Sequence, residues 1–205
     1  MSEAVVLGSR EWFETVKKRL QESEPLKKAA ADWEGAMRCI IEADDDQAFQ
    51  DYTTEDGVKA ILGMLSLLSP EERLKYKDTG LGQLAEKLGL SLDMDPEAID
   101  ATSLKDKVKQ LTREDFQGVT IYASFQPYRG TIREMDPIAP DSYLDAPFTL
   151  SGKYTFWKIL CTGQQTSVQL IMGGKMKLEG DLKYIMKRMA AVNALMEVFK
   201  SIPVK

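Results

Sequence analysis

The chain has 205 residues, of which 43% are hydrophobic and 29% charged, a composition typical of a soluble globular protein with a sizeable core. It contains no histidine, which excludes Ser-His-Asp and Cys-His nucleophile activation and the common zinc sites. The net charge of −5 argues against a nucleic-acid-binding protein, for which a basic surface is expected.

Targeting and cysteine patterns are those of an ordinary intracellular chain. No apolar run reaches the length of a membrane span, and the first residues show no basic region before a long apolar block, so a cytoplasmic location is predicted. The two cysteines, Cys39 and Cys161, lie in apolar stretches. They are expected to be buried thiols rather than a disulfide framework or a metal site, and no cofactor is expected.

The first predicted elements are two helices and a strand. Ser9 is a suitable N-cap for a helix that ends near Glu22, and Pro25 can begin a second, short helix. Residues 33–43 alternate in polarity, which predicts a strand. One face of that strand is expected to carry Met37, Cys39, Ile41 and Ala43.

Three adjacent acids, Asp44, Asp45 and Asp46, follow this strand. Clustered carboxylates suggest a metal site, but the spaced acids, the glycine and the distal glutamate of a calcium loop are missing. A solvated turn is therefore the favoured interpretation, and no metal is expected.

Residues 51–116 are predicted to be helical. Ser69 and Pro70, followed by two glutamates, form a strong helix start. The other helices are expected at residues 55–68, 79–88 and 103–111, where apolar residues recur at helical spacing. The segment has a net charge of −5 and shows neither a repeat of fixed period nor a phosphate-binding loop.

A β-hairpin is predicted next. Residues 119–125 alternate as a strand, residues 126–130 contain the proline and glycine of a turn, and residues 131–135 form the partner strand. The proline-rich residues 136–147 are expected to form a loop that leads into a strand at residues 148–151.

The last third of the chain carries the clearest pattern. Two short helices, the first with Trp157, precede a strand at residues 174–180 in which Met176 and Leu178 share one face. Asp181, or the glycine before it, caps a long amphipathic helix. Its apolar stripe consists of Leu182, Ile185, Met186, Met189, Val192, Met196 and Phe199.

This part of the chain resembles a known family. The run Gly-Lys-Met-Lys-Leu-Glu-Gly-Asp at residues 174–181, with the apolar helix after it and Phe-Thr-Leu-Ser-Gly and a tryptophan-bearing helix before it, is similar to the C-terminal half of the sterol carrier protein 2 family. The resemblance covers residues 141–199, and residues 9–43 are similar to the family's opening. Residues 51–116 have no counterpart in this resemblance, so they are expected to be a helical insertion within a single domain of residues 1–205.

The resemblance implies an α+β fold in which a curved mixed or antiparallel sheet, covered by helices, encloses an apolar tunnel. The methionine-rich stripe, which alone would fit plain core packing, then becomes candidate tunnel lining. Asn193, which falls on this stripe, would hydrogen-bond either a ligand's hydroxyl or carboxyl group or a neighbouring backbone group. The predicted lining residues are Trp157, Met172, Met176, Leu178, Leu182, Ile185, Met186, Met189, Asn193 and Met196.

Two interpretations of the insertion are open. It covers the tunnel mouth and adds lining from Ile61, Leu62 and Leu65, or it is a dimerisation element of a homodimer. The first is favoured, because a long helical insertion in a carrier fold must pack on an apolar surface.

By resemblance, the expected function is to hold a sterol, a fatty acid or a fatty-acyl group in the tunnel and to transfer it without chemistry. The alternative is an accessory module that binds isoprenoid or quinone intermediates in a biosynthetic assembly. A hydrolase that uses Asp or Glu is disfavoured, because no paired-acid motif is present. Residues 174–205 have a net charge of +4, for which a solvated helix face is the favoured interpretation, and transient contact with an anionic membrane surface or with an acyl thioester carrier is the alternative.

Overall fold

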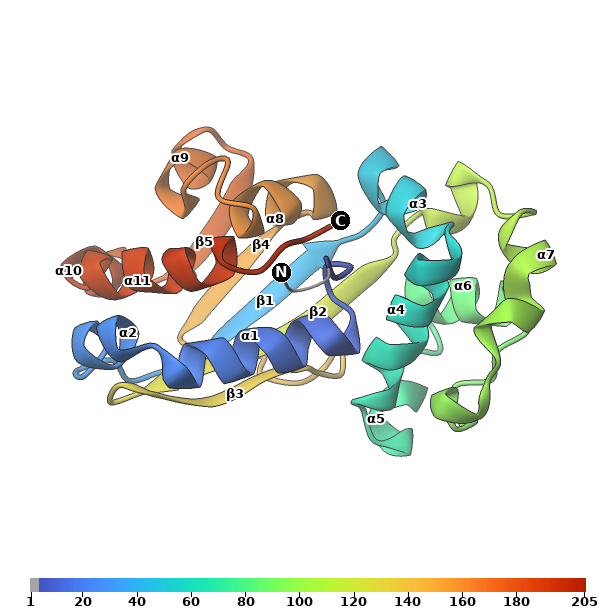
Figure 1. The fold of residues 1–205 in the computed structure, drawn as a ribbon, viewed down its shortest axis with the longest axis horizontal. Coiled ribbons are helices and arrows are strands. Elements are labelled where there is room, and N and C mark those ends of the chain that lie inside the picture. The colour runs from blue at the N-terminus through green and yellow to red at the C-terminus, as the bar shows by residue number, and fades with distance from the viewer. Residues whose placement is uncertain (1–3) are drawn as a thin grey trace.

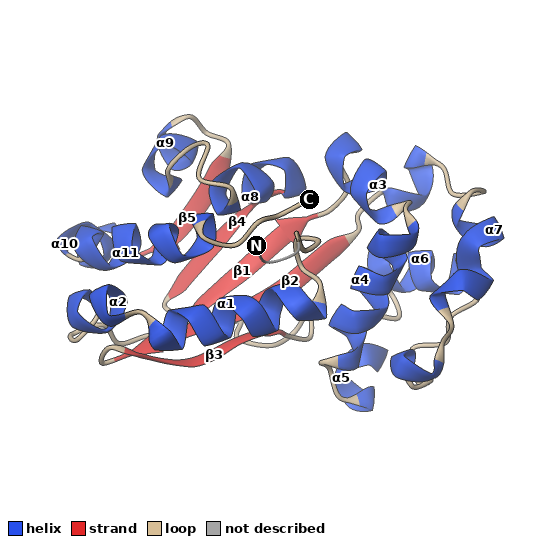
Figure 2. Ribbon diagram, in the orientation of Figure 1, coloured by secondary structure: helices blue, strands red, loops and turns tan. Residues whose placement is uncertain are grey.

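The computed structural model describes residues 4–205, so the first three residues of the expected domain lie outside the described part. It confirms the predicted α+β class, with helices packed on one five-stranded sheet (Figure 1, Figure 2). The strand order is β3-β2-β1-β4-β5. β1 and β4 are parallel and the other neighbours are antiparallel, so the sheet is mixed. The strands are β1 (Met37–Glu42), β2 (Thr120–Tyr128), β3 (Thr131–Pro137), β4 (Phe148–Lys153) and β5 (Met176–Gly180).

The helices form two groups, one across a face of the sheet and one beyond its end (Figure 1). The first group is α1 (Arg10–Glu22), α2 (Glu24–Ala29), α8 (Tyr154–Cys161), α9 (Ser167–Met172), α10 (Leu182–Lys187) and α11 (Met189–Lys200). The second is α3 (Asp46–Tyr52), α4 (Glu55–Ser66), α5 (Pro70–Leu74), α6 (Gly80–Lys87) and α7 (Lys105–Val108), with 3-10 turns η1 (Pro96–Ala98), η2 (Ala101–Leu104) and η3 (Arg113–Phe116). Within residues 4–205, no helix has the length and apolarity needed to cross a bilayer.

The second group, here called the helical cluster, packs around its own buried side chains. α4 contacts α1, α3, η1 and η2. Arg73 of α5 is buried, and its guanidinium donates hydrogen bonds to the carbonyl oxygens of Leu68, Leu92 and Met94 at 2.6, 3.0 and 3.1 Å. These bonds satisfy a buried cation with backbone acceptors and tie α5 to the irregular segment before η1.

Each of the three adjacent acids after β1 has a protein partner. Asp45 is the N-cap of α3 and also accepts a 2.7 Å hydrogen bond from the backbone N–H of Thr155. Asp44 pairs with Lys153 at 2.7 Å, and Asp46 pairs with Arg113 at 2.6 Å. The acids therefore connect the start of the helical cluster to α8 and η3.

The predicted β2–β3 hairpin is confirmed, and both strands extend further than predicted. Arg129 and Gly130 form its two-residue turn with φ values of 48° and 80°, as suits the twist of the flanking strands. Their backbone N–H groups donate hydrogen bonds of 2.8 Å to the carbonyl oxygens of Trp33 and Ala30. The turn is thereby fixed against the segment between α2 and β1.

We expect Gly130→Ala to lower the free energy of unfolding more than Gly118→Ala does. Both glycines have positive φ, 80° and 71°, a conformation that costs alanine roughly 1–2 kcal/mol. A Cβ on Gly130 would also lie 2.4 Å from the carbonyl oxygen of Lys27, whereas one on Gly118 would meet no atom within 4 Å. Urea unfolding should show a difference of roughly 1–3 kcal/mol, and equal losses would contradict the tight contact.

β1 begins at Met37, later than the alternation predicts, so its predicted start at Trp33 was wrong. Gly35 has a φ of 118°, which interrupts the extended chain. Trp33 is buried, and its ring centre lies 6.3 Å from that of Phe148 and 5.9 Å from that of Tyr184. Its indole therefore packs between the sheet and α10.

The long helix predicted at the C-terminal end is two helices, so its continuity was predicted wrongly. α10 ends at Lys187 and α11 begins at Met189. Between them, Arg188 has φ −112° and ψ 27°, outside the helical range. Its guanidinium carbon lies 3.5 Å from the centre of the Tyr184 ring, and it donates a 3.2 Å hydrogen bond to the carbonyl oxygen of Asp32. These contacts accompany the break, which no proline or glycine marks in the sequence.

Candidate functional site

A cavity of about 460 Å³ lies between one face of the sheet and α1, α8, α9, α10 and α11. Its volume is within the usual range of small-molecule pockets, about 300–1,000 Å³. Every strand contributes to the wall. The strand residues are Met37, Cys39, Ile41, Ala123, Phe125, Met135, Leu150 and Leu178.

The strand register aligns some of these side chains in one row. Cys39 is paired with Ala123 on β2 and with Leu150 on β4, and Leu150 is paired with Leu178 on β5. Paired residues project on the same face of a sheet, so the four side chains form a continuous apolar strip across it. This strip is the floor of the cavity.

α8 covers the floor with Trp157, Leu160 and Cys161, which share one side of the helix. The indole nitrogen of Trp157 donates a 3.1 Å hydrogen bond to the carbonyl oxygen of Ile40. The polar atom of the indole is thereby satisfied within the wall, so the ring adds no free donor to the cavity.

Eight of the ten residues predicted to line a tunnel border this cavity. They are Trp157, Met172, Leu178, Leu182, Ile185, Met186, Met189 and Met196. Asn193 does not border it, and its side chain is exposed. Successive helical residues are about 100° apart, so Asn193 lies to one side of the α11 face that carries Val192 and Met196. Its amide is therefore directed to solvent rather than to a ligand in the cavity.

Met176 is buried on the same face of β5 as Leu178, yet it does not border the cavity either. It is paired with Gly152 on β4. A Cβ on Gly152 would lie only 3.0 Å from Cγ of Met176, so the methionine fills the space beside this glycine. α9 packs against β5 and helps to cover this end of the strand.

The three lining residues predicted from the insertion, Ile61, Leu62 and Leu65, are in α4 and do not border the cavity. They are buried where α4 packs within the helical cluster. Along the long axis of the molecule, this cluster lies at the opposite end from α9 and α10 (Figure 1). The apolar residues of α4 therefore pack in the core of the helical cluster. The prediction that Ile61, Leu62 and Leu65 line the cavity was wrong.

Leu7, Trp12 and Trp33 also border the cavity and were not among the predicted residues. Trp12 belongs to the apolar stripe of α1, and its ring stacks on that of Phe199 in α11 with centres 6.1 Å apart. The apolar stripe is visible in the sequence, but it does not show which of its residues border a cavity and which pack against other side chains. The contact between α1 and α11, which only the fold supplies, decides this.

The wall offers a ligand almost no polar chemistry. Among residues 4–205, no charged side chain borders the cavity, and the polar side-chain groups of its lining are the hydroxyl of Ser167, the thiols of Cys39 and Cys161, and the indole N–H groups of three tryptophans. Burial raises the pKa of Cys39 to about 12 and also raises the pKa of Cys161, so both thiols stay protonated at neutral pH. Such a wall can hold hydrocarbon, but it places no group for acid–base catalysis.

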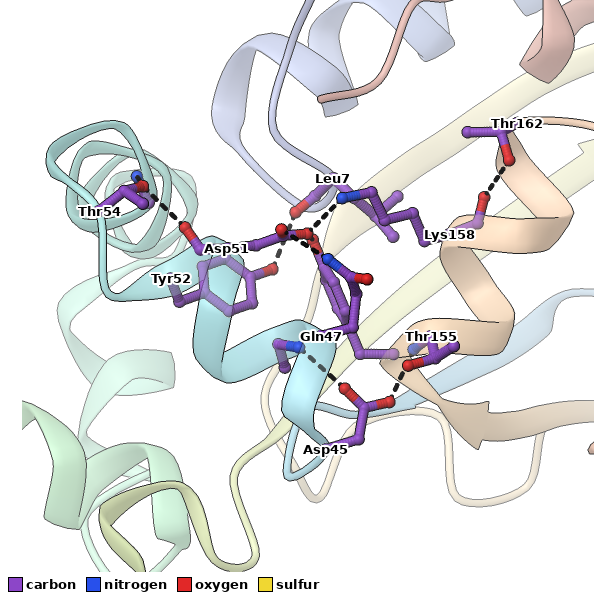
Figure 3. A network of polar contacts seen from close by, with 12 residues as sticks. Leu7, Asp45, Gln47, Asp51, Tyr52, Thr54, Thr155, Lys158 and Thr162 are labelled. Carbon is purple, nitrogen blue, oxygen red and sulfur yellow. Dashed lines mark hydrogen bonds and ion pairs between the residues drawn. The ribbon is translucent and has the colours of Figure 1, made fainter. Parts of the chain in front are cut away.

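A network of polar side chains lies between α3 and α8 (Figure 3). Asp51 accepts hydrogen bonds from Lys158, Tyr154 and Gln47 at 2.7, 2.9 and 2.9 Å. None of the four borders the cavity, and burial is the main cause of the raised pKa of Tyr154. All three donors bond to one carboxylate, so this polar network links α3 of the helical cluster to α8, which covers the cavity floor.

Comparisons with known proteins give a family and a fold. The model of the SCP-2 sterol transfer family matches residues 90–193, just over half of the chain, and includes residues 90–116, which the sequence interpretation had left without a counterpart. The fold is similar to the solution structure of a conserved hypothetical protein, a candidate sterol carrier protein, from Thermus thermophilus, with a TM-score of 0.55 and 14% identity over 100% of this chain and 94% of that one. It is also similar to the crystal structure of sterol carrier protein 2, with a TM-score of 0.52 and 13% identity over 96% of this chain and 98% of that one. Comparison with curated proteins gives no significant match.

Proposed function

Because the chain belongs to the SCP-2 sterol transfer family, we propose that it is a lipid carrier that performs no chemistry on its cargo. The cargo is the hydrocarbon part of a fatty acid, a fatty-acyl group or a sterol, held in the cavity between the sheet and α8–α11. The observation that carries the proposal is a cavity of about 460 Å³ whose wall is nearly all hydrocarbon.

Burial of hydrocarbon supplies the affinity in this proposal. Each methylene removed from water contributes about 0.8 kcal/mol, so about ten methylenes offer about 8 kcal/mol before the entropic costs of association are subtracted. No charged contact is needed for a cargo of this kind, in agreement with the lining.

The cavity lining favours ligands whose hydrocarbon end enters the cavity and whose polar head stays outside. A hydroxyl group inside would lose its hydrogen bonds to water, at a cost of roughly 2–7 kcal/mol when no partner replaces them. The polar partners that the lining offers are the hydroxyl of Ser167, two protonated thiols and the indole N–H of Trp12, since the indole N–H groups of Trp33 and Trp157 already donate to carbonyl oxygens. The polar head of the cargo therefore stays outside, and an ionised carboxylate is held outside more strongly than a hydroxyl.

A polyprenyl chain fits the same wall, which makes binding of isoprenoid or quinone intermediates the second candidate. Like an acyl chain, a polyprenyl chain needs no polar partner along its length. The identity of the bound lipid separates the two candidates.

We expect delipidated protein to be stabilised by palmitate. A ligand that binds only the folded state at about 100 times its Kd raises the free energy of unfolding by about 2.7 kcal/mol. Urea unfolding with and without palmitate measures the increase, and butyrate is the matched control because its chain is too short to fill the cavity.

Native mass spectrometry of freshly purified protein, followed by lipid extraction, identifies the natural cargo. A near-stoichiometric acyl lipid or sterol supports the first candidate, and a polyprenyl lipid supports the second. If palmitate, cholesterol and a polyprenol all leave the unfolding midpoint unchanged, the carrier proposal is wrong.

A further inference from the structure

Four side chains border the cavity and also remain exposed. Val168 and Met172 of α9 are 40% and 84% exposed, and Leu182 and Met186 of α10 are 50% and 70% exposed. Residues that face both the cavity and solvent form the rim of its opening. The mouth therefore lies between α9 and α10, with large apolar side chains around it.

α10 carries a basic row beside its apolar row. Leu182 and Met186 are four residues apart and stack along the helix, and Lys183 and Lys187 form the next row, about 100° further around. Both lysines are exposed, and neither has an ion-pair or hydrogen-bond partner among residues 4–205. We call Val168, Met172, Leu182, Met186, Lys183 and Lys187 the mouth surface.

The chemistry of the mouth surface matches an anionic lipid bilayer. Contiguous exposed apolar side chains normally mark a contact surface. Helices that lie at a membrane surface insert such a row among the acyl chains, while adjacent lysines contact the phosphate groups. A bilayer also supplies what the mouth needs, because a lipid chain would pass between membrane and cavity without crossing water.

The distribution of charge supports the same orientation. Residues 174–188, which include β5 and α10, have a net charge of +3, and residues 51–116 have a net charge of −5. In Figure 1 the helical cluster and α10 lie at opposite ends of the long axis. A negative membrane therefore attracts the end with the mouth and repels the other end.

We propose that the mouth surface docks on an anionic bilayer and that the cargo enters and leaves the cavity through this contact. The inference rests on the proposed carrier function, because it assigns a route to the same cavity. It adds the partner, a lipid surface, and the residues that recognise it.

Cosedimentation with vesicles of phosphatidylcholine and phosphatidylglycerol tests the proposal. Wild-type protein should bind these vesicles, bind pure phosphatidylcholine more weakly and dissociate as salt is raised. Lys183→Ala/Lys187→Ala should bind the anionic vesicles about thirtyfold more weakly. The matched control, Lys77→Ala/Lys105→Ala, removes the same charge from exposed lysines of the helical cluster and should bind at least as well as wild type.

The apolar row is tested with Met186→Ser, which should weaken vesicle binding severalfold, against Leu74→Ser, an exposed leucine of the helical cluster that should have no effect. Equal binding by the two lysine double variants, or equal binding to anionic and neutral vesicles, would overturn the proposal. Palmitate binding in solution is measured in parallel, and Lys183→Ala/Lys187→Ala should retain it. Failure of wild-type protein to bind palmitate would overturn the carrier function itself, which keeps the two failures distinct.

Discussion

Replacement of Ala123 by tryptophan is expected to lower the affinity for palmitate by at least about a hundredfold. Ala123 is on the cavity floor, beside Cys39 on the neighbouring strand. An indole at this position would take the space of about four methylene groups, and their burial at about 0.8 kcal/mol each amounts to about 3 kcal/mol. Displacement of a fluorescent fatty-acid analogue measures the affinity.

The control for this variant is Ala190→Trp. Ala190 is exposed on α11, so the same side chain is added to a cavity-lining helix without entering the cavity, and the affinity should not change. Ala123→Leu should give an intermediate loss, which keeps the test decisive if the tryptophan variant does not fold. Wild-type affinity in a folded Ala123→Trp variant would place the palmitate site elsewhere.

Asp51→Ala should lower the free energy of unfolding by about 3 kcal/mol, the scale of breaking a largely buried ion pair from one side. The substitution removes the shared acceptor of Lys158, Tyr154 and Gln47. The Asp51 and Lys158 side chains are 14% and 20% exposed, so water replaces the lost bonds only in part. Urea unfolding measures the loss.

Glu55→Ala is the matched control for Asp51→Ala. Glu55 pairs with Lys59 at 2.8 Å, but both side chains are about half exposed, so its removal should cost under about 1 kcal/mol. Asp51→Ala/Lys158→Met should recover part of the loss, because it leaves no unpaired ammonium group. Similar losses for Asp51→Ala and Glu55→Ala would show that the link between α3 and α8 is not a stabilising one.

The local patterns of the sequence identify the faces that build the cavity. Alternation on β1 places Met37, Cys39 and Ile41 together, and all three border the cavity. The spacing from Leu182 to Met196 identifies most of the wall that α10 and α11 provide in the same way. Both patterns arise because burial against a neighbour repeats with the period of the element, so they are visible without knowledge of the neighbour.

The rest of the site depends on contacts that no local pattern encodes. Asn193 is on the same helix as Val192 and Met196, but it lies outside the face of α11 that borders the cavity, and α11 contacts α1, α2 and α8, which are far away in the sequence. Ile61 has the apolar surroundings of a lining residue, but its helix packs inside the helical cluster. An apolar stripe shows that a helix face is buried, whereas the partner that buries it is a property of the whole fold.

The central position of β1 has a consequence for how the chain reaches this fold. β1 is made early, yet its two neighbours begin only at Thr120 and Phe148. Non-local pairing of this kind slows folding, because long loops must close before any ladder hydrogen bond of β1 forms. Both edges of β1 stay open until β2 has left the ribosome, and the edge that pairs with β4 stays open until residue 153 has left it. The strand at the centre of the finished sheet is thus the one exposed longest to misassembly.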